Sequence, residues 1–533
     1  MTDARPDHSS LHRAAAGLAA VTLLSRLAGF ARGVVFVRAV GATDVGDTYT
    51  RANTVPNIVF ETVAGGALAS SVVPLLAAPV DEGDREQTLR TTAALLTWSV
   101  ALLVPVSLLG VVLAHPLMSL LTPAHVAGDR AQAVATGARM LAVFSPQIVL
   151  YGVGVVLTGV LQAHRRFLGP ALAPLLSSLV VAAAYLVYAV ETDSHAPTLA
   201  TLTRAQELTL SIGTTAGVAL LSLSLLVPLR RAGVPLRATL EFPPGVRTKA
   251  VRLALAGVAA LAAQQLSLVV VLRLSYGGPA GTLVLYQLGW TIFLLPWAVL
   301  AVPLATSAFP LLVVAHGAGD DALFARLTAT TTGNVLVVSS LAAAGLIACA
   351  EPVARLLVLH ARGVQSPSTL AHAVAAFAPG LIGYGLVAHV GRALYACGRG
   401  RRAAVATVSG WIAVLAADLV IAAVLSPGSR LQALAWGNTV GMTVAGVALV
   451  WALPPASRDG LSRSLLVTGS AGAVSAAAGF LVADRLTTGG LWLTLLGGLL
   501  ASAVVVVVFI LSMAAVMPSA VRTFLARQGA GRD

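Results

Sequence analysis

The stretch SRLAGFARG, Ser25–Gly33, places two arginines inside an apolar run long enough to cross a bilayer. A charged group at that depth costs roughly 2.5–3.5 kcal/mol on insertion scales, so it normally faces a partner or a water-filled cavity. At about 100° per residue, Ser25, Arg26, Gly29 and Arg32 fall within an arc of roughly 120°. The rest of this helix is almost entirely apolar, so the stretch predicts a membrane span with one polar stripe.

The next apolar span carries a second polar stripe. Asn53, Asn57, Glu61 and Gly65 recur every four residues, which puts them on one face of a helix. A basic stripe on one helix and an amide and acid stripe on its neighbour predict the wall of a polar chamber inside a membrane protein.

The composition supports a membrane protein. The chain has 533 residues, of which 57% are hydrophobic and only 10% charged, and its mean hydropathy is +0.88. Soluble domains carry about 25% charged residues, so we expect an all-α integral membrane protein that spans the bilayer many times. We interpret the net charge of +13 as a basic cytoplasmic rim that meets anionic headgroups rather than as a site for nucleic acid.

Hydropathy predicts about fourteen spans. Placing the N-terminus in the cytoplasm puts most arginine clusters on that side, so we expect both termini to be cytoplasmic. The expected spans are residues 14–40, 50–79, 89–114, 131–161, 167–190, 207–229, 250–275, 281–314, 325–350, 370–397, 402–425, 430–453, 462–484 and 488–516.

A basic, proline-containing segment, residues 230–249, lies near the middle of the chain. It predicts a cytoplasmic linker between two lobes of six helices each, followed by two further helices. The expected domains are an N-terminal tail at 1–13, an N-lobe at 14–229, a C-lobe at 250–453, a final helix pair at 454–516 and a C-terminal tail at 517–533.

Two arginines of the first span are candidate anion ligands. Guanidinium is the preferred bidentate partner of phosphate, so Arg26 and Arg32 are expected to line a central cavity. The alternative is that they extend along the helix to the membrane interface. Arg26 lies about twelve residues into the span, which favours the cavity. Arg38, close to the outer end, is expected to reach the interface instead.

Other candidates have two interpretations each. Asp47 is either a gate at the outer mouth of the cavity or a solvated loop acid. Glu61 is either a proton-coupling group or a counter-ion for an arginine. Asn53 and Asn57 serve equally well as ligands or as helix–helix contacts. Arg139 and Asp418 are in-span polar groups whose roles depend on their partners.

Signatures of enzymes and cofactor sites are absent from the sequence. It contains no Walker A loop, H-E-x-x-H motif or G-x-S-x-G elbow, and its two cysteines have no zinc or disulfide spacing. We therefore expect a protein that is not an enzyme and uses no cofactor or metal. Transport would be driven by an ion gradient, the membrane potential or downstream consumption of the product.

Several motifs resemble a known family. The runs SRLAGFAR, GATDVGDTY and PNIVFETVAGGALASSVVPLL resemble the opening of the MurJ (MviN) lipid II flippases of the MOP superfamily, and LPWAVLAVPLATSAFPLL resembles their eighth span. The resemblance implies fourteen helices, with two lobes around a central cationic cavity. It implies transfer of the undecaprenyl-pyrophosphate-linked peptidoglycan precursor, lipid II, to the outer leaflet of the bacterial cytoplasmic membrane by alternating access.

The resemblance also assigns roles to residues. By motif position, Ser25, Arg26 and Arg32 match the cavity-lining SR…R pattern, Asp47 matches an acid before the second span, and Pro56 with Asn57 matches the PN pair. The last two helices would form a groove for the lipid tail. The implied partners are lipid II, the phospholipid bilayer and proteins of cell-wall synthesis or division.

The chain departs from the family pattern at several positions. Gly33 replaces an acid, Phe60 and Glu61 replace arginines, and an arginine of the eighth span is missing near Thr291. We hypothesise that Arg273, near the outer end of the seventh span, compensates for the lost charge. Alternatives are an exporter of polyprenyl-linked polysaccharide, an ion-coupled drug exporter, a non-transporting cell-wall scaffold and a membrane glycosyltransferase or polymer ligase.

Overall fold

A computed structural model of the protein describes residues 8–62, 69–123, 129–192, 196–234, 238–243, 246–359, 361–364, 366–486 and 490–516. It divides into two compact units. The first comprises Met1–Gln265 with Ala361–Gly363, and the second comprises Leu266–His360 with Val364–Asp533. The boundary lies inside a helix, whereas the sequence placed it in the linker at 230–249.

The described part of that linker packs on the first unit. The indole Nε1 of Trp98 donates a hydrogen bond to the Leu240 carbonyl over 2.9 Å. One residue earlier on each segment, the Thr239 amide donates to the Thr97 hydroxyl over 3.1 Å. The chain after the sixth span is therefore tied to the third span rather than extended.

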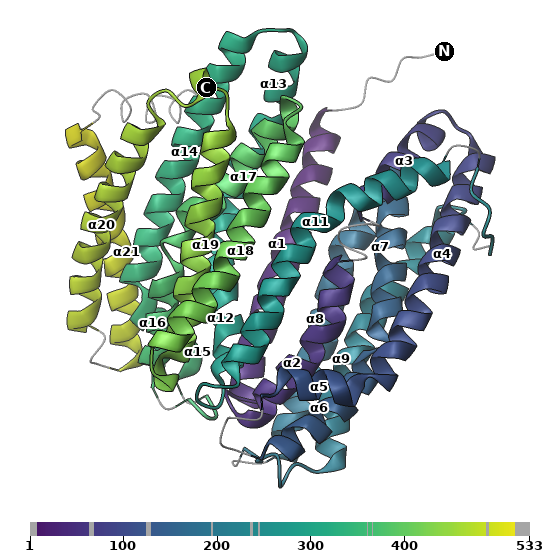
Figure 1. Cartoon of the computed structure of the whole chain (residues 1–533), viewed down its shortest axis with the longest axis horizontal. Coiled ribbons are helices and arrows are strands. Elements are labelled where there is room, and N and C mark those ends of the chain that lie inside the picture. The colour runs from purple at the N-terminus through teal and green to yellow at the C-terminus, as the bar shows by residue number, and fades with distance from the viewer. Residues whose placement is uncertain are drawn as a thin grey trace. The chain divides into compact units, whose positions relative to one another are not determined.

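Helices account for both units (Figure 1). The first unit contains α1 (His8–Ala39), α2 (Asp44–Val59), α3 (Ala69–Asp81), α4 (Arg85–Val112), α5 (Ala114–Leu121), α6 (Arg130–Phe144), α7 (Gln147–Ala163), α8 (Leu168–Glu191), α9 (Arg204–Leu223), α10 (Leu226–Arg231) and most of α11 (Val246–Ser275). The second contains α12 (Thr282–Pro296), α13 (Val302–Gly317), α14 (Asp321–Ala348), α15 (Ala350–Val358), α16 (Pro367–Phe377), α17 (Gly380–Ala396), α18 (Gly400–Val424), α19 (Arg430–Ala452), α20 (Leu461–Leu486) and α21 (Leu491–Val516).

Short polar side chains set where several long helices begin. Asp84, Asp129 and Asp320 each accept a hydrogen bond from the backbone amide three residues later, at the starts of α4, α6 and α14. Thr203 and Gln206 form a reciprocal capping box at the start of α9. These caps satisfy amides that the first helical turn leaves without an intrahelical partner.

The same order of elements occurs in both units. Each has a span with a π-helical turn, at residues 60–62 in the first unit and at Trp297–Ala301 in the second. Each has a long helix followed by a short one, α4 with α5 and α14 with α15. Each then has a span broken at a proline, Pro146 between α6 and α7 and Pro379 between α16 and α17.

Hydroxyl groups satisfy the carbonyls freed at both breaks. In the first unit Thr215 of α9 donates to the Val143 carbonyl over 3.0 Å, three residues before Pro146. In the second unit Thr439 of α19 donates to the Ala376 carbonyl over 2.6 Å, three residues before Pro379. Breaks of this kind are tolerated within a membrane when neighbouring side chains satisfy the backbone.

The described residues contain eleven helices long and apolar enough to cross a membrane, or twelve if the pair α16 and α17, bent by 43°, counts as one span. These twelve correspond to twelve of the fourteen predicted spans. The other two, 50–79 and 250–275, contribute the shorter apolar helices Val72–Asp81 and Leu261–Ser275. The prediction of an all-helical protein with many membrane spans is confirmed, and fourteen is an approximate count.

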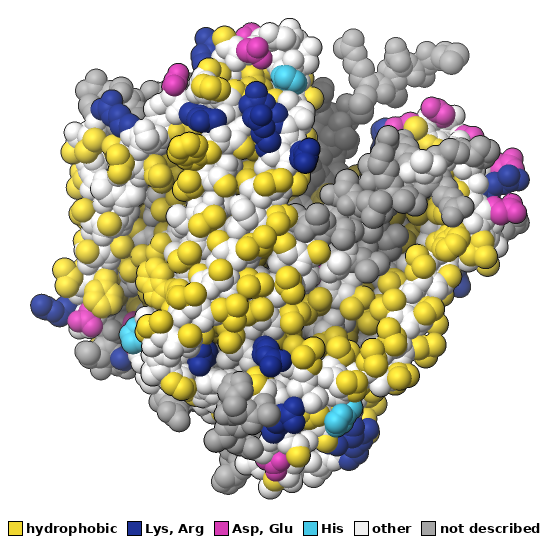
Figure 2. Space-filling model, viewed as in Figure 1, with side chains coloured by type: hydrophobic (Ala, Val, Ile, Leu, Met, Phe, Trp, Pro, Cys, Tyr) yellow, Lys and Arg dark blue, Asp and Glu magenta, His cyan; other side chains and the backbone are white. Residues whose placement is uncertain are grey.

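The surface fits a lipid environment. In Figure 2 the visible sides of α4 in the first unit and of α18 and α19 in the second are covered by hydrophobic side chains. Lysine, arginine and acidic side chains gather near the helix ends of each unit. Each unit therefore carries an apolar band between charged ends, as expected for helices that cross a bilayer.

Candidate functional site

The polar stripe of α1 begins at a contact with α8. The hydroxyl of Ser25 donates to the Ala171 carbonyl over 2.6 Å, and the Ser25 side chain is buried. One turn later, a Cβ added to Gly29 would lie 4.0 Å from the hydroxyl of Ser178. In this conformation Ser25 and Gly29 form a helix–helix contact, whereas the sequence predicted them as ligands.

The two arginines of the stripe differ in their surroundings. Arg26 is exposed, whereas Arg32 is half-buried. Arg32 interacts electrostatically with three tyrosines: Tyr49 of α2, Tyr151 of α7 and Tyr185 of α8. Three helices of the first unit thus supply phenol groups that interact electrostatically with one guanidinium of α1.

Hydrogen bonds fix two of these phenols in place. The hydroxyl of Tyr49 lies 2.8 Å from that of Tyr185 and 2.6 Å from the hydroxyl of Thr214 on α9. The rings of Phe36 and Phe144 pack against Tyr49 at centroid distances of 5.2 and 5.5 Å. This buried network makes a rigid wall, and sequence reasoning missed it because its members come from three separate helices.

Tyr151 connects the basic stripe with the acid of the second span. It interacts electrostatically with Glu61 as well as with Arg32. Glu61 is exposed in the π turn, and the neighbouring Phe60 ring lies 4.4 Å from the Tyr151 ring. Arg32 and Glu61 thus both interact electrostatically with one tyrosine.

A cavity of about 280 Å³ lies beside the Phe60 and Tyr151 rings. Tyr151 and Phe60 line it together with the polar side chains of Thr158 and Gln162, and α8 closes one side. The remaining lining residues are Val73, Gly154, Val155, Gly159, Pro170, Ala173, Pro174, Leu221 and Leu225. The cavity combines an apolar wall with a few polar groups, which is the usual composition of a ligand pocket.

The second stripe is partly engaged within its own helix. The Asn57 amide donates to the Asn53 carbonyl over 2.9 Å, whereas the side-chain oxygen of Asn53 is buried and accepts no hydrogen bond from the described residues. Pro56 is buried between them. Asp47 has only 6% of its surface exposed, so it is not a solvated loop acid.

Arg273 is the candidate ligand that does not belong to the first unit. It is exposed in the last turn of α11 and belongs to the second unit. Its proposed role in replacing a missing arginine stays a prediction.

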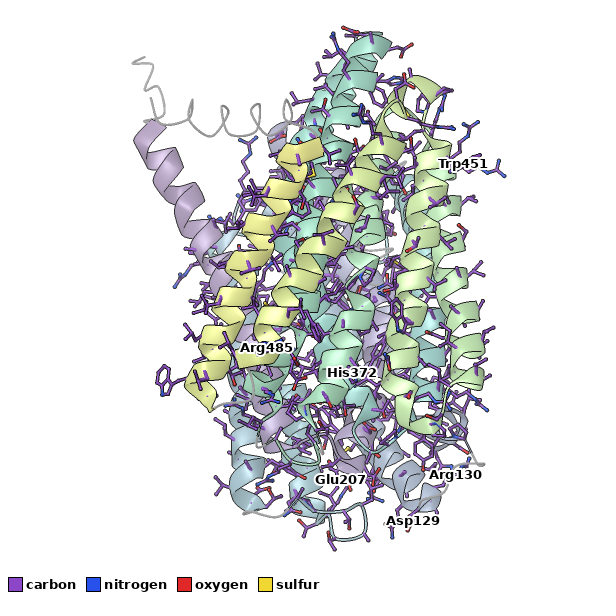
Figure 3. The ribbon with its side chains drawn as sticks, turned by 90° about the vertical axis from the view of Figure 1, so that its left-hand side faces the viewer. Asp129, Arg130, Glu207, His372, Trp451 and Arg485 are labelled. Atoms are coloured by element: carbon purple, nitrogen blue, oxygen red, sulfur yellow. The ribbon has the colours of Figure 1, made fainter. Side chains whose placement is uncertain are left out.

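A buried ion network in the first unit was not predicted. The Glu207 carboxylate on α9, only 2% exposed, accepts hydrogen bonds from Arg139 of α6 at 3.0 and 2.7 Å and pairs with Arg204. Figure 3 shows Glu207 at the end of the unit where Asp129 and Arg130 also lie. Arg139 and Glu207 lie 68 residues apart in the sequence. The only sequence signal for the pair is that both are charged residues inside predicted spans.

The second unit contains a different buried acid. Asp418 of α18 and Asn438 of α19 are essentially inaccessible, and their side-chain oxygens and nitrogen have no hydrogen-bond partner among the described residues. A Cβ on Gly437 would lie 1.8 Å from the Asp418 carboxylate, so glycine is required beside it. Tyr286 of α12 interacts electrostatically with Asp418. An unpartnered acid inside a membrane marks a functional group more often than a structural one.

These groups can bind and hold charge. A half-buried guanidinium with phenols nearby can bind a phosphate oxygen through charge-assisted hydrogen bonds. An acid in the π turn can accept a proton or counter the arginine. Among the described residues, no group of three or more His, Cys, Asp or Glu side chains could hold a metal ion.

Comparison with known proteins gives one family. The sequence pattern of the family "Lipid II flippase MurJ" matches residues 36–524, which begins just after the SRLAGFARG stretch. The lipid II flippase MurJ of Burkholderia cenocepacia is 30% identical over 178 residues, covering 33% of this chain and 34% of that protein. The probable lipid II flippase MurJ of Synechocystis is 30% identical over 237 residues, covering 44% and 43%. The chain thus matches less than half the length of these relatives.

Solved structures show the same fold at low identity. A lipid II flippase MurJ in an inward closed conformation superposes with a TM-score of 0.75 at 16% identity, covering 95% of this chain and 99% of the other. An inward-facing MATE multidrug transporter of the MOP superfamily gives a TM-score of 0.65 at 15% identity, covering 81% and 93%. Because the family pattern extends over most of the sequence, the chain belongs to the MurJ lipid II flippase family.

Proposed function

We propose that the protein is a flippase that moves lipid II, the undecaprenyl-pyrophosphate-linked peptidoglycan precursor, from the cytoplasmic to the outer leaflet. The proposal places it in the bacterial cytoplasmic membrane with both termini in the cytoplasm, and it treats the activity as transport rather than catalysis. The observation that carries it is Arg32, half-buried in a membrane span and in electrostatic interaction with three tyrosines, of which Tyr151 lines a cavity.

The physical requirement is set by the substrate. A pyrophosphate-linked sugar headgroup must cross about 30 Å of hydrocarbon, so it needs a polar and positively charged path, whereas its polyprenyl tail can stay in lipid. Half-buried Arg32 supplies charge on α1, and exposed Arg26 supplies a second positive group six residues earlier. Asn53, with an unused buried oxygen, can accept hydrogen bonds from a sugar or peptide.

The proposal assigns the tail to the last two helices. α20 and α21 pack closely because glycines let them approach: a Cβ on Gly479 would lie 2.5 Å from Val505, and one on Gly497 would lie 2.9 Å from Leu486. The outer side of α21 exposes Trp492, Leu499 and other large apolar side chains. An isoprenoid chain can lie along such a surface while the headgroup enters the polar path.

Coupling is assigned to two in-span acids, buried Asp418 and exposed Glu61. Alternating access requires that inward and outward states differ in affinity, because a ligand that binds both equally shifts nothing. Asp418, buried without a hydrogen-bond partner among the described residues, can change its partner between states by taking up a proton or a cation. Glu61 next to Tyr151 can do the same on the substrate side.

The test uses a strain depleted of its native flippase. The protein is expressed at matched levels, and labelled precursor that becomes accessible to an outside probe is measured. Wild type is expected to restore accessibility, Arg32→Ala to reduce it at least about ten-fold, and Arg26→Ala to reduce it less because Arg26 is exposed. Arg90→Ala is the matched control, since its ion pair with Glu86 is on the surface and worth little.

Two results would contradict the proposal: no restoration by wild type, or full activity of Arg32→Ala at normal protein level. The same assay tests Arg273→Ala, where unchanged accessibility would dismiss its compensating role. Purified protein in vesicles separates the alternatives. A scaffold would move no precursor, and a polysaccharide exporter would prefer other polyprenyl-linked sugars.

A further inference from the structure

A groove lies on α18 and α19 in the second unit, and none of the residues discussed above lines it. Its volume is about 570 Å³, and it is lined by Arg401, Arg402, Val405, Ala406, Ser409, Ala448, Trp451 and Ala452. A smaller hollow of about 330 Å³ continues along α19, lined by Thr443, Val444, Val447, Ala448 and Trp451. Ala448 and Trp451 line both, so the two hollows form one surface groove with a basic end and an apolar length.

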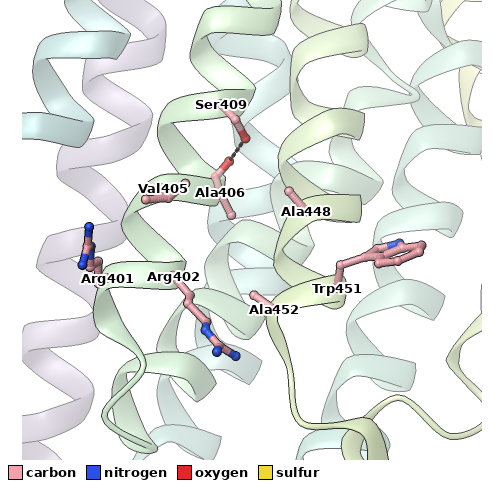
Figure 4. A pocket seen from close by; sticks show the side chains of 8 residues that line it. All are labelled: Arg401, Arg402, Val405, Ala406, Ser409, Ala448, Trp451 and Ala452. Carbon is pink, nitrogen blue, oxygen red and sulfur yellow. Dashed lines mark hydrogen bonds between the residues drawn. The ribbon is translucent and has the colours of Figure 1, made fainter.

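The basic end of the groove is formed by two arginines. Arg401 and Arg402 are exposed, and neither side chain has an ion-pair or hydrogen-bond partner among the described residues. No carboxylate lines the groove. Figure 4 shows Arg402 extending toward the end of α19 that carries Ala452, with Arg401 on the other side of α18. Two unpaired guanidinium groups at one end of an apolar groove favour an anionic ligand.

The polarity of the helix ends agrees with an anion at this place. Arg401 and Arg402 lie in the first turn of α18, where the helix dipole is positive. The neighbouring end of α19 is a C-terminus and would repel an anion, but Arg458 caps it by donating to the Leu453 carbonyl over 2.9 Å and to the Trp451 carbonyl. The negative end of α19 is therefore neutralised from within the chain.

The position of the groove along the membrane-spanning helices favours a lipid as its ligand. The 25 residues of α18 rise about 37 Å, more than the roughly 30 Å of hydrocarbon, so its first turn reaches the headgroup layer. Trp451, 72% exposed in the last turn of α19, sits where interfacial tryptophans are enriched. Beyond it, exposed Val444 and Val447 line the part of the groove that faces hydrocarbon.

From these observations we propose that this groove binds an anionic phospholipid. The phosphate contacts Arg402, Arg401 adds positive charge at the same end of the groove, and an acyl chain lies along Val405, Val444 and Val447. With the orientation proposed above, the lipid belongs to the cytoplasmic leaflet. The Ser409 hydroxyl does not contribute a free donor, because it donates to the Ala406 carbonyl of its own helix over 2.8 Å (Figure 4).

The test compares lipid binding by the purified full-length protein in detergent, measured by native mass spectrometry. Phosphatidylglycerol is the anionic probe and phosphatidylcholine the zwitterionic one. Arg401→Gln/Arg402→Gln removes the basic end. Arg230→Gln/Arg231→Gln is the matched control, because it removes the same charge from two adjacent exposed arginines at the end of α10.

Wild type is expected to retain phosphatidylglycerol in preference to phosphatidylcholine. The Arg401→Gln/Arg402→Gln variant is expected to bind phosphatidylglycerol about thirty-fold more weakly, and the control to change by less than about two-fold. A second readout is the quenching of tryptophan fluorescence by phosphatidylglycerol brominated on its acyl chains. This quenching should decrease more in Trp451→Phe than in Trp492→Phe.

Equal retention of both lipids by wild type would overturn the proposal. Unchanged binding by the Arg401→Gln/Arg402→Gln variant, or an equal loss in the control, would overturn it as well. A mass of two chains that disappears only in the Arg401→Gln/Arg402→Gln variant would instead identify a second copy of the protein as the occupant. The arginine variants test this proposal separately from precursor transport, because none of the four substituted arginines lies in the proposed path of the precursor.

Discussion

The α8–α9 pair of the first unit and the α18–α19 pair of the second have the same packing and different chemistry. α9 contains GTTAG at 213–217, and α19 contains GNTVG at 437–441. Cβ atoms added to Gly217 and Gly441 would meet Val181 of α8 and Val414 of α18 at 2.3 and 2.1 Å. Small residues at both positions let each helix pair approach closely, as GxxxG spacing does in membranes.

The residue after the first glycine is where the two motifs differ. In the first unit Thr214 completes the hydrogen-bonded network of Tyr49 and Tyr185. In the second unit Asn438 occupies the matching position, next to Asp418, and neither side chain has a hydrogen-bond partner among the described residues. The same helix packing therefore carries a hydrogen-bonded network in the first unit. In the second unit it carries an acid and an amide that have no hydrogen-bond partner among the described residues.

Neutralising the buried acid should change thermal stability in opposite directions in the two units. Asp418→Asn carries the larger expected effect. Replacing a carboxylate that has no partner removes a cost of about 1–3 kcal/mol, so thermal unfolding in detergent should shift upward. Precursor accessibility should fall at least about ten-fold if the acid couples transport. A variant with unchanged melting temperature and full transport would remove Asp418 from the account.

Glu207→Gln should destabilise the first unit. The carboxylate accepts charge-assisted hydrogen bonds from Arg139 and pairs with Arg204, and such bonds are worth about 1.5–3 kcal/mol each before solvent screening. Both arginines are about half exposed, so we expect a net loss of about 2 kcal/mol. Thermal unfolding measures it, with Glu86→Gln as an exposed control. A higher melting temperature for Glu207→Gln would mean that the two buried acids respond to neutralisation in the same direction.

Thr215→Val and Thr439→Val should have small and equal effects. Each removes one hydroxyl that satisfies a carbonyl three residues before a proline break, so each should cost about 1 kcal/mol. Measured melting temperatures that fall by the same amount would support equivalent breaks in the two units. A lower melting temperature for only one of the two variants would mean that the two breaks have the same spacing but not the same energetic contribution.

Much of the fold was accessible from the sequence because span length and hydropathy are local properties. The breaks at Pro146 and Pro379 fall inside the predicted fourth and tenth spans, 131–161 and 370–397. The repeat was expected only from spacing, since its evidence lies in contacts such as those of Thr215 and Thr439, which connect residues more than 60 positions apart.

The site was predicted less completely, for a physical reason. Helical periodicity puts Ser25 and Arg32 on one face, but it does not say what that face meets, and Ser25 turned out to contact the α8 backbone. Likewise Arg139 and Asp418 were visible as in-span charges, yet only the structure distinguishes an acid-paired arginine from an acid with no hydrogen-bond partner among the described residues. Tertiary partners, rather than residue types, separate packing from function.

The central claim is that Arg32 binds a diphosphate. The most direct measurement is the affinity of the purified protein for undecaprenyl-pyrophosphate-linked disaccharide peptide, compared between wild type, Arg32→Ala and the surface control Arg90→Ala. The account predicts that Arg32→Ala weakens binding by about 10- to 100-fold and that Arg90→Ala leaves it unchanged. Equal affinity of wild type and Arg32→Ala would contradict it.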